Sequence, residues 1–127
     1  MNEIIFFIYV IILSLSSILA LKLSKSALIS LISLQAVLAN LFVTKQIGLC
    51  GFTATASDAL AVGCTLGLNL IQEYYNKEEA QRAVNISFFC LAVYTVLTIL
   101  HLNYLPAQTD CSQSSFELIL SSMPRII

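Results

Sequence analysis

Long apolar runs without charged residues alternate with short polar segments along the 127-residue chain. Three of these runs cover residues 4–21, 26–44 and 83–105, and each approaches the roughly 20 residues with which a helix crosses about 30 Å of hydrocarbon. A fourth, glycine-containing run is less apolar, which suits a helix that lies among other helices. The pattern predicts transmembrane helices at about 4–21, 26–44, 58–75 and 78–105, an outer loop at 106–115, and the amphipathic start of a further helix at 116–127.

The composition agrees with a protein embedded in a lipid bilayer. Hydrophobic residues make up 58% of the chain and charged residues 10%, and the mean hydropathy is +0.90. We therefore expect an all-α, polytopic membrane protein with one membrane domain over residues 1–127, four transmembrane helices and the start of a fifth. The net charge is -1 and no basic run exceeds two residues, so nucleic acid is not expected as a direct partner.

Basic residues are unevenly distributed over the predicted loops. Lys22 and Lys25 fall in the first loop and Lys77 and Arg82 in the third, whereas the second loop holds only Lys45. Because cytoplasmic loops are enriched in lysine and arginine, we expect the first and third loops in the cytoplasm. The N-terminus then lies outside, together with the loop that follows the last span.

A polar stripe runs along the predicted helix at 58–75. With 100° steps between residues, one sector of this helix is polar, and a second holds Ala59, Gly63 and Gly67, where a G-x-x-x-G pattern lets another helix approach closely. Unpaired amides and carboxylates are costly in hydrocarbon, so a polar stripe at membrane depth indicates a functional surface. The members of the stripe are Asp58, Thr65, Asn69, Gln72, Glu73 and Asn76.

Two interpretations of this stripe are open. Its amides can tie a helix bundle together, at about 1 kcal/mol or less for each bond. Six polar residues at matching angles, two of them carboxylates, instead favour a water-accessible pathway. Weaker stripes add Asn40 on the second span, and Tyr94 and His101 on one face of the fourth. His101 is expected either at the interface or on the pathway, and a lone histidine does not make a metal site.

Asn76 separates the third and fourth predicted helices. Asparagine tolerates the left-handed conformation that ends many helices, and Glu79, three residues later, fits a capping box at the start of the next helix. Glu78 and Arg82 have the spacing of an i,i+4 ion pair. These features predict a tight, solvated cytoplasmic turn.

Motifs of soluble enzymes and of cofactor or metal sites are absent from the sequence. It contains no G-x-S-x-G, no P-loop, no G-x-G-x-x-G and no paired histidines, and its four cysteines lack zinc-ligand spacing. We therefore expect neither enzymatic activity nor a cofactor. Cys50 and Cys111 fall in predicted outer loops, which leaves a disulfide between them open.

Three other kinds of membrane protein fit parts of the pattern. A disulfide-generating oxidoreductase would use Cys50 and Cys111, but neither has a close redox partner. A dimeric four-helix exporter would need a carboxylate within its first helix, whereas Glu3 lies at the edge. A structural subunit would use Gly63 and Gly67 only for assembly, and a homodimer is compatible with that face.

Several segments together carry a family resemblance. They are residues 39–45 (ANLFVTK), 51–52 (GF), 67–80 (GLNLIQEYYNKEEA), 101–106 (HLNYLP), Asp110 and 124–127 (PRII). These segments resemble the queuosine precursor transporter family, also called the VUT family, over roughly residues 26–127. Many members of that family carry Asp where Asn69 stands and Gly where Asn76 stands. The first departure weighs against proton coupling at that position.

The resemblance implies a bacterial inner-membrane importer, a six- or seven-helix bundle that carries 7-deazaguanine bases used to make queuosine in tRNA. It also implies that this chain is an N-terminal portion of such a transporter. A guanine-type edge offers an N–H and an amino group side by side, which a carboxylate accepts together, while amides bind the carbonyl. Tyr74 or Tyr94 could stack on the ring. The expected substrate-binding residues are Asn40, Asp58, Asn69, Gln72, Glu73, Tyr94 and His101.

Overall fold

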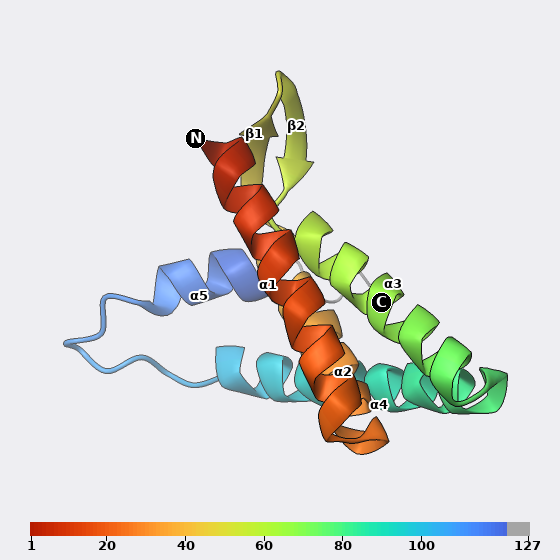
Figure 1. Ribbon diagram of the computed structural model, residues 1–127. Coiled ribbons are helices and arrows are strands. Elements are labelled where there is room, and N and C mark those ends of the chain that lie inside the picture. Colours follow the sequence, from red (N-terminus) through yellow and green to blue (C-terminus); the bar gives the residue numbers. More distant parts are fainter. Residues whose placement is uncertain (122–127) are drawn as a thin grey trace.

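The computed structural model describes residues 1–121 as a mostly helical chain with one small hairpin (Figure 1). Four long helices lie over the apolar runs, with ends that differ from the expected ones by a few residues. The predicted helix start at 116–127 is met by a short helix that begins earlier, and the positions after residue 121 lie outside the described residues. The elements are α1 (Asn2–Leu23), α2 (Lys25–Phe42), β1 (Gln46–Leu49), β2 (Phe52–Thr55), α3 (Asp58–Tyr74), α4 (Lys77–Leu102) and α5 (Gln113–Leu120).

Three of the helices within residues 1–121, namely α1, α2 and α4, are long and apolar enough to cross a membrane. The chain is therefore a multi-pass membrane protein. Helix α3 has 17 residues and one polar side, and it is not among these three. That α3 also spans the bilayer stays a prediction.

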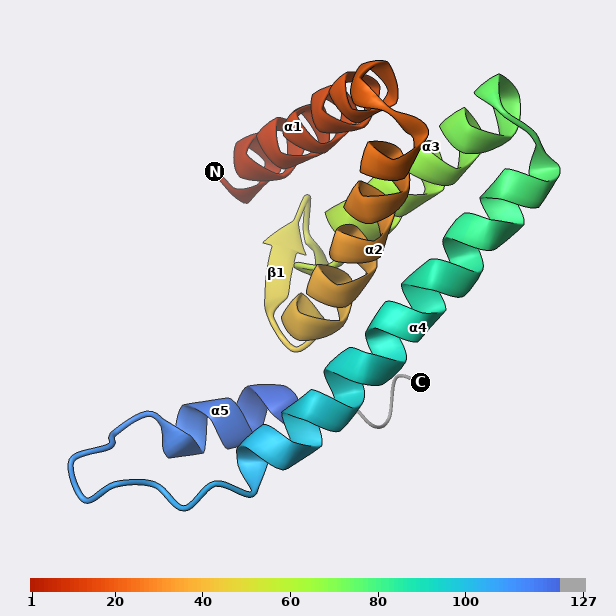
Figure 2. The same cartoon turned by 90° about the horizontal axis from the view of Figure 1, so that it is seen from below.

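Helix α2 lies at the centre of the helix packing, where it contacts α1, α3 and α4 (Figure 2). Tight turns join α1 to α2 and α3 to α4, and an N-cap side chain begins the second helix of each pair. Ser24 accepts a hydrogen bond from the Ala27 amide at 3.0 Å, and Asn76 accepts one from the Glu79 amide at 2.8 Å. Each cap satisfies an amide that the first turn of a helix leaves without a backbone partner.

The buried core consists of two apolar clusters. One joins α1, α2, α3 and α4 through Ala20, Leu28, Ile29, Ile32, Ile71 and Ala83, and the other joins α1 to α3 through Leu13, Ala59 and Leu60. Polar contact between long helices is provided by Ser33 and Ser87, whose hydroxyls lie 3.1 Å apart at the α2–α4 interface. Helix α2 therefore packs against α1, α3 and α4.

The hairpin β1–β2 corrects the all-α expectation, because it forms a two-stranded sheet where a loop was expected between the second and third spans. Leu49 pairs with Phe52 across a two-residue turn, and both turn residues have positive φ, 49° at Cys50 and 84° at Gly51. Positive φ at both positions is the hallmark of the type I′ turn, whose twist matches that of the strands. The hairpin rests on the start of α1, where Asn2 donates to the Gly48 carbonyl at 3.1 Å and Glu3 accepts from the Cys50 amide at 3.0 Å.

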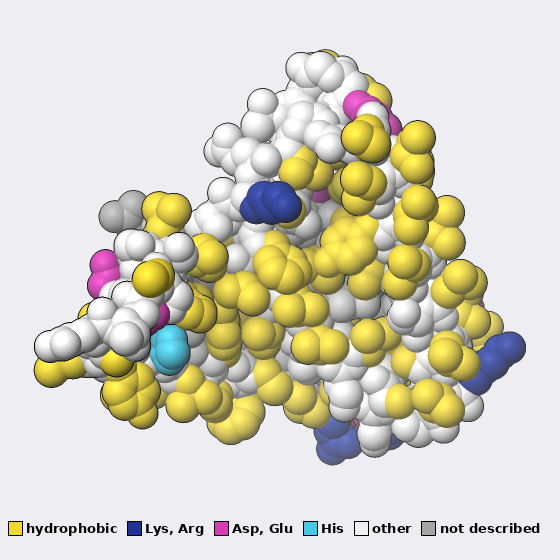
Figure 3. All heavy atoms as spheres, turned by 90° about the vertical axis from the view of Figure 1, so that its left-hand side faces the viewer, with side chains coloured by type: hydrophobic (Ala, Val, Ile, Leu, Met, Phe, Trp, Pro, Cys, Tyr) yellow, Lys and Arg dark blue, Asp and Glu magenta, His cyan; other side chains and the backbone are white. Residues whose placement is uncertain are grey.

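Apolar side chains cover much of the molecular surface, as the face in Figure 3 shows. Large hydrophobic residues on α1 and α4 are strongly exposed, among them Phe7, Leu15, Phe88 and Phe89. An apolar surface of this extent is unusual for a soluble monomer and suits contact with lipid or with further helices. It agrees with the membrane-spanning character of α1 and α4.

Candidate functional site

Helix α3 presents two chemically opposite faces. Its small-residue face is buried against α2, as the G-x-x-x-G pattern predicts. A Cβ atom at Gly67 would lie 2.6 Å from Cγ1 of Ile32, and one at Gly63 would lie 2.8 Å from Oε1 of Gln35. A side chain at Gly67 would collide with Ile32, and one at Gly63 would displace the flexible end of Gln35. The predicted packing face is therefore confirmed.

The polar face of α3 points away from this contact. All six predicted members, from Asp58 to Asn76, are exposed within the described chain. Thr65 donates only to the Ala61 carbonyl of its own helix, at 3.0 Å. A shallow groove of about 430 Å³ follows this side of α3, lined by Ala61, Val62, Thr65, Leu66 and Asn69. No hydrogen bond in residues 1–121 joins this face to α1 or α2, so the amides do not tie these helices together.

Asp58 has a local structural role at the start of α3. Its carboxylate accepts from the amide of Thr55 at 3.0 Å and from the Thr55 hydroxyl at 2.9 Å. A carboxylate in the first turn of a helix is also favoured by the helix dipole. Asp58 therefore fixes the junction between β2 and α3, at one end of the polar face.

Asn40 and Tyr94 lie in a different place, on α2 and α4. Asn40 donates to the Ala36 carbonyl at 3.0 Å, while its Oδ1 atom is buried. The hydroxyl of Tyr94 is buried as well. The two residues follow Ser33 and Ser87 by seven positions each, and the bonded serines mark the contact between these helices. Within the described residues, no hydrogen bond connects Asn40 or Tyr94 to the polar face of α3.

His101 packs among aromatic rings at the far end of α4. Its ring lies 6.1 Å from the ring of Tyr104 and 5.2 Å from that of Phe116, both in edge-on geometry. The second contact joins α4 to α5. In this structure His101 helps to dock α5 and is exposed, away from the polar side of α3.

The turn between α3 and α4 differs from two of the expectations. Asn76 is extended, with φ -175°, and Tyr75 ends α3 without a left-handed residue. Arg82 pairs with Glu79 at 3.3 Å, not with Glu78. Glu79 also pairs with Lys25 at 3.2 Å, which ties α4 to the start of α2. The capping of α4 by Asn76, in contrast, is confirmed.

Gln35 is a notable residue that pattern reasoning missed. It lies on α2 with only 2% of its surface exposed, and neither atom of its amide has a hydrogen-bond partner within the described residues. Its amide lies against Gly63 of α3. A single glutamine in the uncharged run 26–44 was the only available signal in the sequence.

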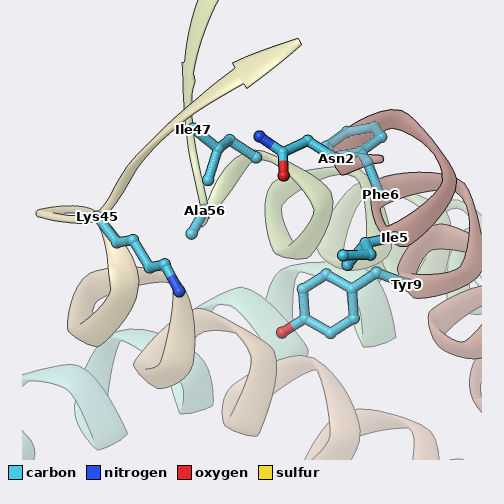
Figure 4. Close-up of a pocket in the computed structure, with 7 residues that line it drawn as sticks. All are labelled: Asn2, Ile5, Phe6, Tyr9, Lys45, Ile47 and Ala56. Carbon is cyan, nitrogen blue, oxygen red and sulfur yellow. The ribbon is translucent and has the colours of Figure 1, made fainter.

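A cavity of about 240 Å³ lies between the start of α1, the hairpin and the end of α2 (Figure 4). The ammonium of Lys45 and the hydroxyl of Tyr9 point toward one another across it, and Asn2 lies at its rim. The remaining lining is apolar, from Ile5, Phe6, Ile47 and Ala56. The cavity lies beside the hairpin end of the helices and shares none of the predicted site residues.

The described part of the chain holds no cluster of three or more residues suited to binding a metal ion. All four cysteines are free, so the disulfide left open between Cys50 and Cys111 is not formed. In the outer loop, the carboxylate of Asp110 accepts from the Ser112 hydroxyl at 2.6 Å and from its amide at 2.9 Å. These two bonds favour the charged form and lower the pKa of Asp110.

Comparison with known proteins decides the family. The family described as "Putative vitamin uptake transporter" matches residues 55–127, more than half of the chain. The chain belongs to this family. The match begins at the last residue of β2 and takes in the whole of α3, with both of its faces, and α4. The family is described as one of transporters, which agrees with the apolar, membrane-spanning helices of this chain.

A curated relative of this chain comes from Bacillus subtilis (strain 168). Named "Probable queuosine precursor transporter", it is 32% identical over 102 residues, which are 80% of this chain and 44% of the relative. The chain thus spans less than half of the relative's length. No solved structure matches the chain. The resemblance to queuosine precursor transporters is confirmed.

Proposed function

We propose that this chain forms part of a bacterial inner-membrane importer of queuosine precursors, with 7-deazaguanine bases as the cargo. The family and the name of the 32% identical relative support a transporter of this kind. The cargo would be a small, planar, purine-like molecule. The distribution of basic residues supports an outward N-terminus, which puts the hairpin outside and the Lys25–Glu79 pair in the cytoplasm.

The observation that carries the proposal is the free polar face of α3. A face with a carboxylate and two amides is unfavourable against lipid, because hydrocarbon offers these groups no hydrogen bonds. The opposite face of the same helix already packs on α2. The polar face therefore suits a water-filled, cargo-binding space that further helices of the transporter enclose.

Glu73, Asn69 and Gln72 provide the chemistry that a guanine-type base requires. The Glu73 carboxylate can accept two parallel hydrogen bonds from the ring N–H and the exocyclic amino group. Asn69 and Gln72 lie on the same face and can donate to the carbonyl. Tyr74 is 67% exposed next to Glu73 and offers a ring on which the base can stack.

The other expected residues lie away from Glu73, Asn69 and Gln72, and we propose different roles for them. Asn40 and Tyr94 supply buried polar atoms at the α2–α4 contact, where they would form a second wall. Asp58 would hold the outer end of α3 in place through Thr55. His101 would act through the docking of α5 and without contact to the cargo.

Uptake of labelled queuine or its precursors tests the proposal, in cells that lack their own transporter and express the complete gene. Glu73→Gln removes the charged acceptor and should lower uptake about 10- to 100-fold, the range for a hydrogen bond to a charged group. Glu78→Gln is the matched control, because Glu78 is exposed in the first turn of α4, outside the polar face of α3. Equal uptake by wild type and Glu73→Gln would remove Glu73 from the site, and absence of wild-type uptake would contradict the proposed function.

A further inference from the structure

Gln35 is placed where a purely structural residue would be apolar. Its neighbours along the α2 face that packs on α3 are Leu28 and Ile32, and all three are buried. The amide lies on the bare backbone of Gly63, and both of its polar atoms lack a partner within residues 1–121. A leucine would fill a similar volume without leaving a buried donor and acceptor unbonded.

The contact with Gly63 shows that the fold makes room for this amide. A Cβ atom at Gly63 would approach the Gln35 amide oxygen to 2.8 Å, its carbon to 3.1 Å and its nitrogen to 3.3 Å. One turn further along α3, Gly67 leaves the same kind of space for Ile32. At the α2–α3 contact, a glycine of α3 thus leaves room for the unbonded amide of Gln35, just as another glycine leaves room for the apolar side chain of Ile32.

We propose that Gln35 is a cargo-binding residue, covered by Gly63 while α2 and α3 are in contact and uncovered when the two helices separate. This inference rests on the proposed function. The amide presents one donor and one acceptor side by side, which match a heterocycle edge that carries the opposite pair.

A 7-deazaguanine base offers such an edge on the side away from its carbonyl group. The N–H of its five-membered ring and the neighbouring nitrogen of its six-membered ring are a donor and an acceptor, both attached to the same carbon. The Gln35 amide can bind both of these atoms, donating to the ring nitrogen and accepting from the N–H. This edge changes when the five-membered ring nitrogen carries a methyl group or a sugar, so Gln35 would select the free base over its N-substituted forms.

The first test replaces Gln35 with Leu in the complete transporter. Because the substitution removes a buried, unbonded amide, we expect the melting temperature of the purified protein to rise by a few degrees. Uptake of the free base should show an apparent KM about 10-fold higher, the cost of losing one or two hydrogen bonds. Competition by the N-methylated base, weak in the wild type, should approach that of the free base. Gln81→Leu, which removes an exposed amide on α4, is the control.

Gly63→Ala provides a second variant that leaves the amide itself intact. The added methyl group meets the flexible end of Gln35, so the amide must move while the fold should tolerate the change. We expect an increase in KM in the same direction, with a small change in melting temperature.

The outcomes separate this inference from the proposed function. A wild-type protein that neither takes up the free base nor is stabilised by it against heat overturns both. A wild-type protein that binds the base, together with a Gln35→Leu variant of unchanged KM and unchanged selectivity, overturns only the role of Gln35. If Gln35→Leu raises the melting temperature and also makes uptake weaker and less selective, the role of Gln35 in cargo binding is supported. Loss of a purely structural residue would not raise stability while it lowers uptake.

Discussion

The two faces of α3 differ in almost every respect, although they alternate along the same 17 residues. Toward α2, small residues allow backbone contact, and Gly67 receives the side chain of Ile32. Away from α2, Asn69, Gln72 and Glu73 are exposed and make no bond to another described helix. The first face is used within this chain, whereas the second is free to bind something else. Within α3, the comparison separates the residues that build the fold from those that are available to a cargo.

The largest change in stability is expected from a substitution on the packing face of α3, compared with one on its polar face. Ile71 is fully buried on the packing side, so Ile71→Ala should lower the free energy of unfolding by about 2–5 kcal/mol. Asn69→Ala, two residues away on the polar face, should change it by about 0.5 kcal/mol or less. Denaturant unfolding of the purified protein in detergent measures both values. Similar losses for the two variants would show that the polar face is also a packing face.

A smaller effect is expected at Asn76, where the polar face meets the turn. The side chain caps α4 through the Glu79 amide at 2.8 Å, so Asn76→Ala should cost about 1 kcal/mol of stability. Asn76→Ser keeps a capping oxygen and should retain most of that stability and full uptake. If Asn76→Ser abolished uptake without changing stability, Asn76 would belong to the cargo site and not to the turn.

The assignment of residues to the packing face or to the polar face of α3 could largely be predicted from residue spacing. The 100° step of a helix places Gly63 and Gly67 on one side of α3 and Asn69, Gln72 and Glu73 on another, whatever the partner helix is. The cap at Asn76 was equally predictable, because it depends only on residues three positions apart. Local periodicity and capping rules carry this information.

Other features depend on contacts that spacing does not encode. The hairpin was taken for a loop because its strands have only four residues each and its turn uses Cys50 and Gly51. The Lys25–Glu79 pair joins residues far apart in sequence, so local spacing favoured Glu78 as the partner of Arg82. Gln35 was not predicted as a site residue, because a single polar residue does not form a periodic pattern along a helix. Its burial becomes clear only from its contact with Gly63.

Access of water to the polar face of α3 distinguishes a face that lines a cargo site from one that is covered by lipid or by another helix. A variant whose native cysteines are replaced would carry one new cysteine, at Asn69 or at Ile71, and would be treated in intact membranes with a membrane-impermeant thiol reagent. We expect Asn69→Cys to react, a 7-deazaguanine base to slow the reaction, and Ile71→Cys to stay unreactive. An Asn69→Cys protein that does not react, or that reacts equally fast with and without the base, would contradict the claim that this face lines the cargo site.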